Sequence, residues 1–382
     1  MRTTAAPPAC TIVPPYLLER IRQEGGPRAA AVAGQTLVLD LRARAHREVR
    51  AARRGGGGDG TPTPGGFVPL ALQEKVQRRP VPGAAEAPAA AAPDRAVHDA
   101  AHATTLPGAL VRAEGGAPTA DAAVTDAFDH LGATWQLYWQ AYRRDSLDGL
   151  GLPLVASVHY GVAYDNAFWN GAQMVFGDGD GLYFNPFTAS VDVVGHELTH
   201  GFTQYAAGLT YVGQSGALNE SVSDVFGSLV KQLHLGQRAQ DADWLIGDGL
   251  FTSRVRGVAL RSMKAPGTAY DDPVLGKDPQ PADMDGYVDL PHDDQHDSGG
   301  VHTNSGIPNH AFYLAATALG GNAWEQAGQV WYDVLTSPGL AKDIGFAGFA
   351  GATVDAATTR FGAGSPAARA VREAWQAVKV LS

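Results

Sequence analysis

Large apolar residues between positions 124 and 142 recur at alternating steps of four and three. They are Val124, Phe128, Leu131, Trp135, Tyr138 and Tyr142. This spacing aligns side chains on one face of a helix, so the sequence predicts an amphipathic helix over residues 124–142.

The pattern changes on either side of residue 188. Residues 153–187 are rich in glycine, aromatic residues and Asp-Gly pairs, which is typical of strands joined by tight turns. From residue 188 onwards the pattern is mostly helical, with a long irregular stretch at 264–300. Strands followed by helices indicate an α+β protein with two lobes.

Two shorter helices are predicted near the N-terminus. The first contains Tyr16, Leu17, Leu18 and Ile21 after a Pro-Pro pair, and the second is an arginine-rich segment over 37–54. They hold too little apolar material for an independent domain, so we expect residues 1–54 to pack against the rest. Residues 55–93 are rich in Gly, Pro and Ala and predict a flexible linker. The remaining chain is divided into lobes at 94–205 and 206–382.

The overall composition is that of a folded protein, because 45% of the 382 residues are hydrophobic and 18% are charged. The net charge of −10 argues against nucleic acid as a partner. Residues 1–54 carry +6 and the rest −16, so the two parts attract each other. No apolar run is long enough to span a membrane, and no ordinary secretory signal is visible. Cys10 is the one cysteine, which excludes an internal disulfide framework.

The sequence HELTH at 196–200 is the strongest chemical signal. Positions i and i+4 of a helix share a face, so His196 and His200 can converge on one metal ion. Glu197 can then reach a metal-bound water without being a ligand, as in the zinc-protease signature of this form. Ser190 is a candidate N-cap for the helix.

A third zinc ligand is expected from a nearby helix, because catalytic zinc has three protein ligands and an open position. Glu220 lies 20 residues beyond His200, among apolar residues, and we assign it as that ligand. Asp224, one turn further on, is the candidate acceptor for the N–H of a ligating imidazole. The alternative is a pair of buried core histidines and a solvated helix face.

Six motifs occur in an order that resembles the thermolysin-like neutral zinc metalloendopeptidases. They are NAFWNG at 166–171, GDGDG at 177–181, VDVVGHELTHG at 191–201, GALNESVSD at 216–224, LRSM at 260–263 and SGGVHTNSG at 298–306. The resemblance covers about residues 95–382. It implies a strand-rich N-terminal lobe and a mostly helical C-terminal lobe, with a cleft between them and the active-site helix at the junction. A Val-Pro-Pro-Tyr sequence at 13–16 and KAPGTAYDDP at 264–273 resemble the protealysin-type members, which have a short precursor segment.

The resemblance also implies residue roles. Glu197 is the expected general base that activates a zinc-bound water, His302 and Tyr211 stabilise the oxyanion, and Asp297 orients His302. Asn166, the Ala167 carbonyl and Arg261 are expected to bind the substrate backbone, with Arg261 clamping a carbonyl. An apolar pocket is expected from Phe184, Phe187, Val193 and Leu260. These roles predict cleavage on the N-terminal side of hydrophobic residues.

Residues 1–54 are, by the same resemblance, a short propeptide that blocks the cleft and is cut away. The protein would then be a zymogen whose own propeptide is an intramolecular inhibitor. Two interpretations of Cys10 remain: a buried structural cysteine, which we prefer, and a thiolate that caps the zinc.

Thermolysin itself has a double calcium site beside its active-site helix. Asp192, Asp243 and Asp248 match its ligands, but Lys231 and Leu245 replace two acidic ones. An ammonium group repels calcium and neutralises carboxylates, so we expect the double site to be lost and Lys231 to stand in as the cation. A single weak calcium site stays compatible with the sequence.

The sequence analysis therefore predicts a monomeric zinc endopeptidase that is secreted by a non-classical route, with a cytoplasmic location as the alternative. Two other functions stay open: an inactive, zinc-held binding protein and an aminopeptidase of the same zinc class. An aminopeptidase needs acidic residues that hold a free amine, and none accompany HELTH.

Overall fold

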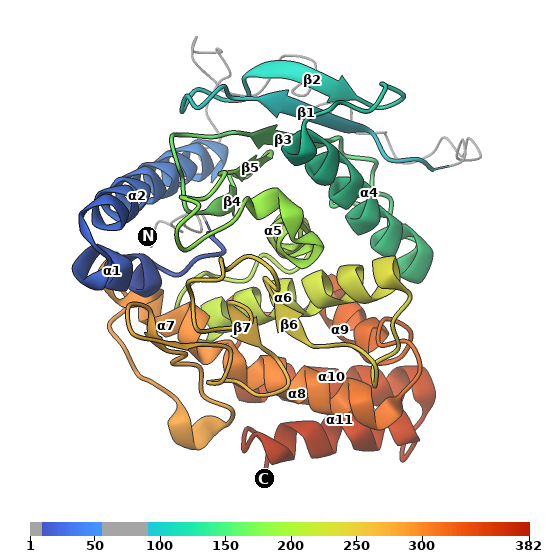
Figure 1. The fold of residues 1–382 in the computed structure, drawn as a ribbon. Coiled ribbons are helices and arrows are strands. Elements are labelled where there is room, and N and C mark those ends of the chain that lie inside the picture. The colour runs from blue at the N-terminus through green and yellow to red at the C-terminus, as the bar shows by residue number, and fades with distance from the viewer. Residues whose placement is uncertain (1–9, 56–90) are drawn as a thin grey trace.

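The structure is a computed structural model, and it describes residues 10–55 and 91–382 (Figure 1). Most of the predicted linker at 55–93 lies outside the described residues. None of the described helices is long and apolar enough to cross a membrane.

A five-stranded mixed sheet forms one side of the molecule (Figure 1). Its strands are β1 (Arg95–Asp99), β2 (Ala109–Ala113), β3 (Leu154–Val158), β4 (Ala167–Trp169) and β5 (Met174–Phe176), in the order β2-β1-β3-β5-β4. β3 is parallel to β1 and β5, whereas β2 and β4 are antiparallel edge strands. All residues of the central strand β3 are buried, which agrees with its apolar composition.

The predicted amphipathic helix is α4 (Ala122–Tyr142), which packs against the sheet. It begins where the Asp121 side chain accepts hydrogen bonds from the backbone N–H groups of Ala123 and Val124. Its apolar face is buried from Val124 to Tyr142, as the spacing predicts.

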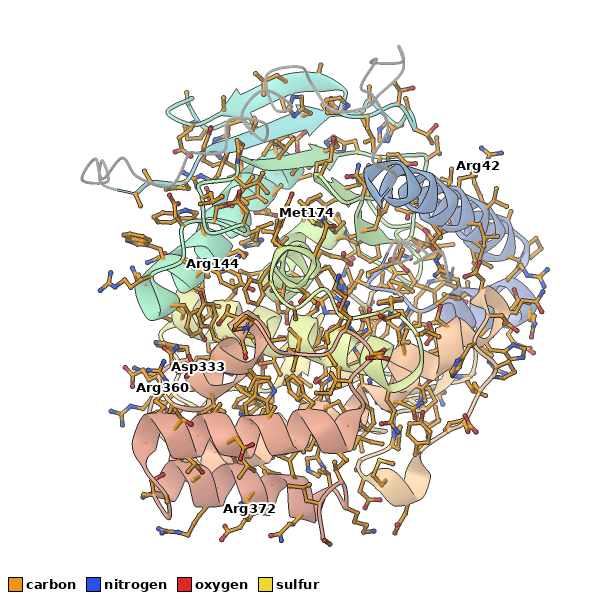
Figure 2. All side chains as sticks on the ribbon, turned by 180° about the vertical axis from the view of Figure 1, so that it is seen from behind. Arg42, Arg144, Met174, Asp333, Arg360 and Arg372 are labelled. Atoms are coloured by element: carbon orange, nitrogen blue, oxygen red, sulfur yellow. The ribbon has the colours of Figure 1, made fainter. Side chains whose placement is uncertain are left out.

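The other lobe is mostly helical. Its helices are α6 (Gly213–Leu235), α7 (Asp297–Asn304), α8 (Gly306–Leu319), α9 (Ala327–Thr336), α10 (Phe346–Phe361) and α11 (Pro366–Ala377). Short elements lie between α6 and α7: β6 (Leu245–Ile246), β7 (Arg261–Ser262), β8 (Asp271–Asp272), β9 (Gly276–Lys277), η2 (Met284–Gly286) and η3 (Asp294–His296). A further short helix, η1 (Phe187–Ala189), directly precedes α5 in the strand-rich lobe. Seen from behind, Arg360 of α10 pairs with Asp333 of α9 at the surface, with contacts of 2.5 and 2.8 Å (Figure 2).

Helix α5 (Val191–Tyr205) carries HELTH and lies between the sheet and α6 (Figure 1). Ser190 occupies the N-cap position, but the expected capping hydrogen bond is absent. Its hydroxyl donates instead to the carbonyl of Asp248, at 2.9 Å. The cap prediction was therefore right in position and wrong in chemistry, because a neighbouring loop supplies a competing acceptor.

The N-terminal segment forms α1 (Pro15–Glu24) and α2 (Pro27–Gly55), which lie against the edge strand β4 and near α7 (Figure 1). Helix α2 begins ten residues before the predicted start at Leu37, because the Ala-rich stretch after Pro27 favours helix without an apolar stripe. Ile12 and Val13, together with Leu17, Leu18 and Ile21 of α1, belong to the main hydrophobic core. The segment therefore packs on the body, as its small apolar content predicts.

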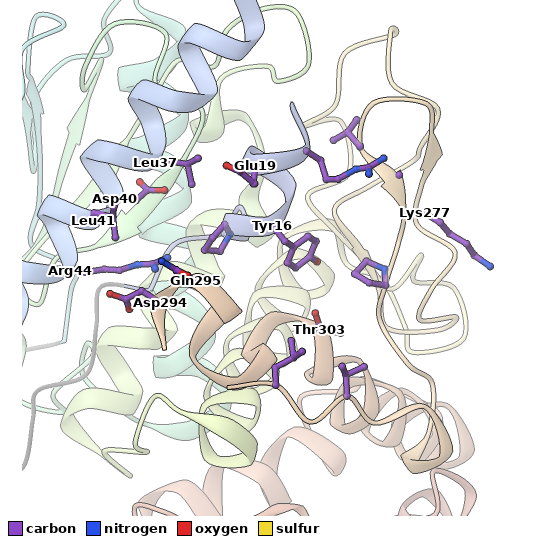
Figure 3. Close-up of a pocket in the computed structure, with 17 residues that line it drawn as sticks. Tyr16, Glu19, Leu37, Asp40, Leu41, Arg44, Lys277, Asp294, Gln295 and Thr303 are labelled. Carbon is purple, nitrogen blue, oxygen red and sulfur yellow. The ribbon is translucent and has the colours of Figure 1, made fainter. Parts of the chain in front are cut away.

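A cavity of about 1020 Å³ separates the two N-terminal helices from the irregular loops of the helical lobe (Figure 3). Tyr16, Leu37 and Leu41 line it from α1 and α2. Leu275 and Val288 are among the residues that line the opposite side.

Candidate active site

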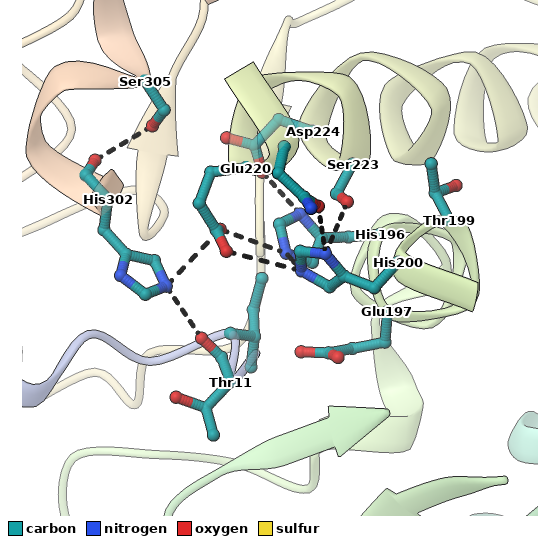
Figure 4. A network of polar contacts seen from close by, with 12 residues as sticks. Thr11, His196, Glu197, Thr199, His200, Glu220, Ser223, Asp224, His302 and Ser305 are labelled. Carbon is teal, nitrogen blue, oxygen red and sulfur yellow. Dashed lines mark hydrogen bonds and ion pairs between the residues drawn. The ribbon is translucent and has the colours of Figure 1, made fainter. Parts of the chain in front are cut away.

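Three buried side chains from α5 and α6 converge on one point (Figure 4). His196 and His200, one turn apart on α5, place their Nε2 atoms 3.0 Å from each other. Glu220 of α6 places Oε2 3.5 Å from His196 Nε2 and Oε1 3.5 Å from His200 Nε2. The structure thus brings together the three proposed metal ligands.

Outer partners fix the orientation of both imidazoles. His196 Nδ1 lies 2.7 Å from Asp224 Oδ1, and His200 Nδ1 lies 2.9 Å from Asn219 Oδ1. Asn219 Nδ2 donates to the Leu209 carbonyl, which leaves its Oδ1 as the acceptor. Each histidine therefore carries its proton on Nδ1 and turns an Nε2 lone pair towards Glu220. Asn219 was not predicted as a site residue, although its position beside Glu220 on α6 was a usable signal.

This donor set fits zinc. Two lone pairs held 3.0 Å apart repel each other unless a cation lies beside them. Glu220 Oε2 has no hydrogen-bond donor, although it is buried. Two imidazole nitrogens and a carboxylate are the ligands of catalytic zinc sites, whereas calcium and magnesium prefer oxygen ligands throughout.

Asp224 connects this cluster to Arg261. Arg261 donates from Nε and Nη2 to the two carboxylate oxygens of Asp224, both at 2.8 Å, and Asn309 Nδ2 donates to Oδ2 at 2.8 Å. Burial alone raises the pKa of Asp224, but the Arg261 charge and the His196 hydrogen bond outweigh it and hold the pKa well below its usual range. The two-pronged contact of Arg261 is therefore with Asp224, and its binding of a substrate carbonyl stays a prediction.

Glu197 faces the sheet from α5. Its Oε2 accepts the backbone N–H of Trp169, the last residue of β4, at 2.9 Å. Figure 4 shows its carboxylate below the histidine pair and apart from Glu220. Glu197 is thus a second carboxylate near the cluster and is not one of the three converging groups. This is the placement that a general base requires.

His302 of α7 approaches from the opposite lobe. Its Nδ1 lies 2.7 Å from Asp297 Oδ1, and its Nε2 lies 3.4 Å from Glu220 Oε2. Burial alone lowers the pKa of His302, but the charges of Asp297 and Glu220 outweigh it and raise the pKa. The Tyr211 hydroxyl lies 3.5 Å from His302 Nε2 and donates to Glu220. His302 and Tyr211 thus offer two donors on one side of the cluster.

A left-handed turn sets the position of His302. The four residues Asp297 to Gly300 have φ values of 53°, 52°, 92° and 72°. A Cβ at Gly299 would lie 3.1 Å from the backbone of Gly213, at the start of α6. Glycine is needed here because α7 could not otherwise approach α6 so closely.

Residues 11–13 run through the site, with Thr11 paired to Phe168 of β4 as an isolated antiparallel bridge and bends at Ile12 and Val13. The Ile12 N–H donates to the Ala167 carbonyl at 3.2 Å, and the Ile12 carbonyl accepts from Arg261 Nη1 at 3.1 Å. Asn166 contacts both backbone groups of Val13, at 2.9 and 3.2 Å. The residues expected to bind a substrate backbone therefore bind the backbone of the N-terminal segment.

The four residues expected to form the apolar pocket are all buried. They are Phe184, Phe187, Val193 and Leu260. All four belong to the same hydrophobic core as Ile12. Phe184 packs on Phe187 and on Phe251, with ring centroids 5.7 Å apart in each pair.

Comparison with known proteins identifies the family. Residues 87–204 match the family model described as the thermolysin metallopeptidase catalytic domain, and residues 207–380 match that of the thermolysin metallopeptidase alpha-helical domain. The chain belongs to the thermolysin family of metallopeptidases. It is therefore a metalloendopeptidase, and the family implies zinc as its catalytic cofactor.

Similar members of the thermolysin family match between 70% and 98% of the chain. An extracellular metalloprotease of Pectobacterium carotovorum subsp. carotovorum is 48% identical over 98% of this chain and 97% of its own length. Protease PrtS of Photorhabdus sp. (strain Az29) is 53% identical over 70% of this chain and 71% of its own. The structure of the precursor of protealysin, a metalloproteinase from Serratia proteamaculans, matches with a TM-score of 0.81 and 50% identity over 98% of this chain and 100% of that one. These matches confirm the predicted two-lobed α+β fold and the likeness to protealysin.

Cys10 lies beside the ligand cluster of this thermolysin-family site. Its Sγ and donor atoms of His200 and Glu220 all lie within 4.8 Å of one another. It is 1% exposed and also packs with Tyr211 and Val301. A structural role accounts for this burial, but it gives no reason for the closeness to two metal donors.

Lys231 of α6 lies among the residues that match the ligands of the double calcium site of thermolysin, a site that we expected this chain to lack. Its Nζ lies 2.8 Å from Asp243 Oδ2, 3.5 Å from Asp192 Oδ2 and 4.0 Å from Asp248 Oδ2. Burial raises the pKa of Asp192, and the charge of Lys231 opposes this rise. Leu245 lies nearby in sequence, in β6. The ammonium group thus sits among the three carboxylates that the sequence analysis compared with calcium ligands.

Proposed function

We propose that this chain is the precursor of a zinc endopeptidase that cuts peptide bonds on the N-terminal side of hydrophobic residues. The main support is the course of residues 11–13, whose backbone groups meet Ala167, Arg261 and Asn166 in turn. Pairing through main-chain atoms is independent of sequence, as a protease that accepts many substrates requires.

The proposed reaction uses the groups around the ligand cluster. His196, His200 and Glu220 would hold zinc, which would supply a Lewis acid for the carbonyl and lower the pKa of water. Glu197 takes a proton from the attacking water and passes it to the leaving nitrogen. His302 and Tyr211 donate to the carbonyl oxygen as it becomes negative, each contributing about 3 kcal/mol in such sites. Asp297 orients His302.

Specificity is proposed to come from the apolar pocket. Phe184, Phe187, Val193 and Leu260 present no polar group to the residue after the scissile bond, so a charged side chain there would be buried without a partner. Ile12, fully buried, is the residue of the N-terminal segment that corresponds to this position. A hydrophobic residue in a substrate would replace it.

The N-terminal segment is proposed to act as an inhibitory propeptide over 1–54, joined by a linker over 55–93 to the lobes at 94–205 and 206–382. Its backbone occupies the hydrogen-bonding groups of Asn166, Ala167 and Arg261 that a substrate backbone would need, so its removal is required for activity. Relatives named as extracellular proteases support secretion, for which we propose a non-classical route. We further propose that the mature enzyme is a monomer.

The test is limited trypsin digestion of the full-length, zinc-loaded chain, followed by a peptide assay. We expect a peptide blocked at both ends to be cut before Leu or Phe, and at least about tenfold more slowly when Asp replaces that residue. An aminopeptidase would leave the blocked peptide intact, and an inactive binding protein would cut no peptide at all.

Glu197→Gln separates catalysis from folding. We expect this variant to lose activity by about 10²- to 10⁴-fold while it unfolds at the same temperature as wild type. The matched control is Glu325→Gln, at an exposed position that contacts Asn322, and it should stay fully active. Normal activity of Glu197→Gln would refute the mechanism.

A further inference from the structure

We propose that the Thr11–Ile12 peptide bond is the first bond this enzyme cuts, within its own chain, and that Cys10 holds the cut back. The inference rests on the proposed function, because it needs the same catalytic groups. It adds a self-processing site to the propeptide, 40 residues or more before the linker.

The two ends of this bond are held as a substrate bond would be. On one side, the Thr11 carbonyl oxygen lies 2.9 Å from His302 Nε2, one of the two proposed oxyanion donors. On the other side, the Ile12 nitrogen donates to Ala167 at 3.2 Å. Thr11 and Ile12 are both fully buried. The bond is therefore fixed between the group that would stabilise the carbonyl oxygen and the strand that would hold the leaving nitrogen.

Hydrogen bonds at Val13 fix the register of residues 11–13 in the site. Asn166 grips both backbone groups of Val13, and its Nδ2 also donates to Asp40 Oδ2 at 2.9 Å. Asp40 lies on α2 and accepts a second hydrogen bond from the Tyr164 hydroxyl. Asp40 of the propeptide thus holds the Asn166 side chain, and Asn166 in turn holds the propeptide backbone at Val13.

Cys10 explains why so well placed a bond can persist. It directly precedes Thr11, and its Sγ lies with the donor atoms of His200 and Glu220. A thiolate is a strong zinc ligand, and a fourth protein ligand closes the position that catalytic zinc keeps open for water. With that position closed, the Thr11 carbonyl lacks a nucleophile although its donors are in place.

The proposed cut is an ordinary hydrolysis and needs water alone as co-reactant. Glu197 removes a proton from the water, and the oxygen bonds to the Thr11 carbonyl carbon. The carbon–nitrogen bond then breaks, and the proton passes to the Ile12 nitrogen. The second proton of the water also passes to this nitrogen, so the products are a carboxylate at Thr11 and an ammonium group at Ile12, with no change in oxidation state. Figure 4 shows the Glu197 carboxylate pointing towards the side on which Thr11 lies.

The cut would divide activation into two stages. Residues 1–11 would leave with Cys10, whereas Val13, α1 and α2 would keep their contacts with the body. The intermediate would therefore still be docked but would no longer be held at the ligand cluster.

The test uses full-length, zinc-loaded Cys10→Ala and mass spectrometry over time. We expect a product that begins at Ile12 to form at least about tenfold faster than in wild type, because the open coordination position is restored. Its rate should be independent of protein concentration, as an intramolecular cut requires. The double variant Cys10→Ala with Glu197→Gln should stay uncut. Cys10→Ser, which preserves side-chain size, should behave like Cys10→Ala and guards against a folding artefact.

A second measurement does not depend on activity. Wild-type protein loaded with cobalt(II) should show thiolate-to-cobalt absorption in the near ultraviolet, and Cys10→Ser should lack it. Absence of this band in wild type would overturn the role of Cys10.

Other results separate this inference from the proposed function. If Cys10→Ala keeps Thr11–Ile12 intact while trypsin-treated wild type cuts the blocked peptide, self-cleavage is wrong and the endopeptidase stands. If neither the Thr11–Ile12 bond nor the blocked peptide is cut, both the self-cleavage and the endopeptidase function are wrong. A cutting rate that rises with protein concentration would show that one molecule cuts another, which overturns the intramolecular step.

Discussion

Asp224 serves two parts of the site with one carboxylate. It orients His196 at the ligand cluster, and it holds Arg261, whose remaining nitrogen binds the Ile12 carbonyl. All three side chains are buried. The proposed metal binding and backbone recognition would therefore depend on the same ionised group.

We expect Asp224→Ala to lower the free energy of unfolding by about 3–5 kcal/mol, because it leaves the Arg261 charge buried without its partner. Zinc affinity should fall by about 10- to 100-fold, because His196 loses its orienting acceptor. Thermal unfolding and zinc titration measure the two effects. The control Glu19→Ala removes an exposed ion pair with Arg22 and should cost no more than about 1 kcal/mol. An equal loss of unfolding free energy in Asp224→Ala and Glu19→Ala would contradict the assignment of Asp224 as the partner of Arg261.

Asp40 makes propeptide docking depend on pH. Burial raises the pKa of Asp40 to about 6, although Tyr164, Arg44 and Asn166 each act to lower it. An undocked Asp40 would titrate near 3.8, so the docked form binds the proton more tightly. Docking should therefore be strongest below about pH 4 and weaken as the pH rises to about 6. Thermal unfolding from pH 4 to 7 measures this, and Asp40→Asn should remove this part of the pH dependence. If the unfolding temperatures of wild type and Asp40→Asn change with pH in parallel, Asp40 is not the group that makes docking depend on pH.

The individual site residues were predictable where the signal was local. The spacing of His196 and His200 indicates a metal pair by itself, and the family motifs supplied His302. Asn309 was missed because it contacts Asp224 from 85 positions away in the chain. Asp40 was missed because its partner Asn166 lies 126 positions away. Only the packed structure brings such residues together.

At the level of elements, the close contact of α5 and α6 creates the ligand cluster. A Cβ at Gly227 of α6 would lie 2.5 Å from the Asp192 carbonyl, and one at Gly195 would lie 3.1 Å from Gly227 Cα. The two glycines let the helices approach until Glu220 reaches both histidines. The sequence predicted both helices but could not predict this distance, because glycine inside a helix has several explanations.

Lys231 should replace calcium as the cation that joins α5 and α6 to the following loop. We expect a calcium-selective chelator to leave the unfolding temperature unchanged, because the ammonium already neutralises Asp192 and Asp243. Lys231→Met should lower the free energy of unfolding by about 3 kcal/mol, since the buried Asp192 carboxylate would lose its cationic partner. A chelator that strips calcium and lowers the unfolding temperature with zinc retained would refute this expectation.

Across the whole molecule, α5, α6 and residues 10–13 meet at the ligand cluster, so zinc should stabilise all three together. Removal of zinc with a chelator should lower the unfolding temperature of the full chain. Zinc at 1,000 times its dissociation constant contributes about 4 kcal/mol by mass action. Glu220→Gln should reduce the difference between zinc-loaded and zinc-free protein, as thermal unfolding can measure. An unchanged difference would exclude Glu220 as a ligand.

The cavity between the N-terminal helices and the loops of the helical lobe has a consequence for activation. A hollow of about 1020 Å³ means that α1 and α2 touch the body over part of their facing surface only. Departure of α1 would still re-expose buried apolar side chains such as Leu17, Leu18 and Ile21, but the hollow keeps this area below that of a contact without a gap. If the N-terminal segment is removed as we propose, the hollow therefore favours its release from the two lobes.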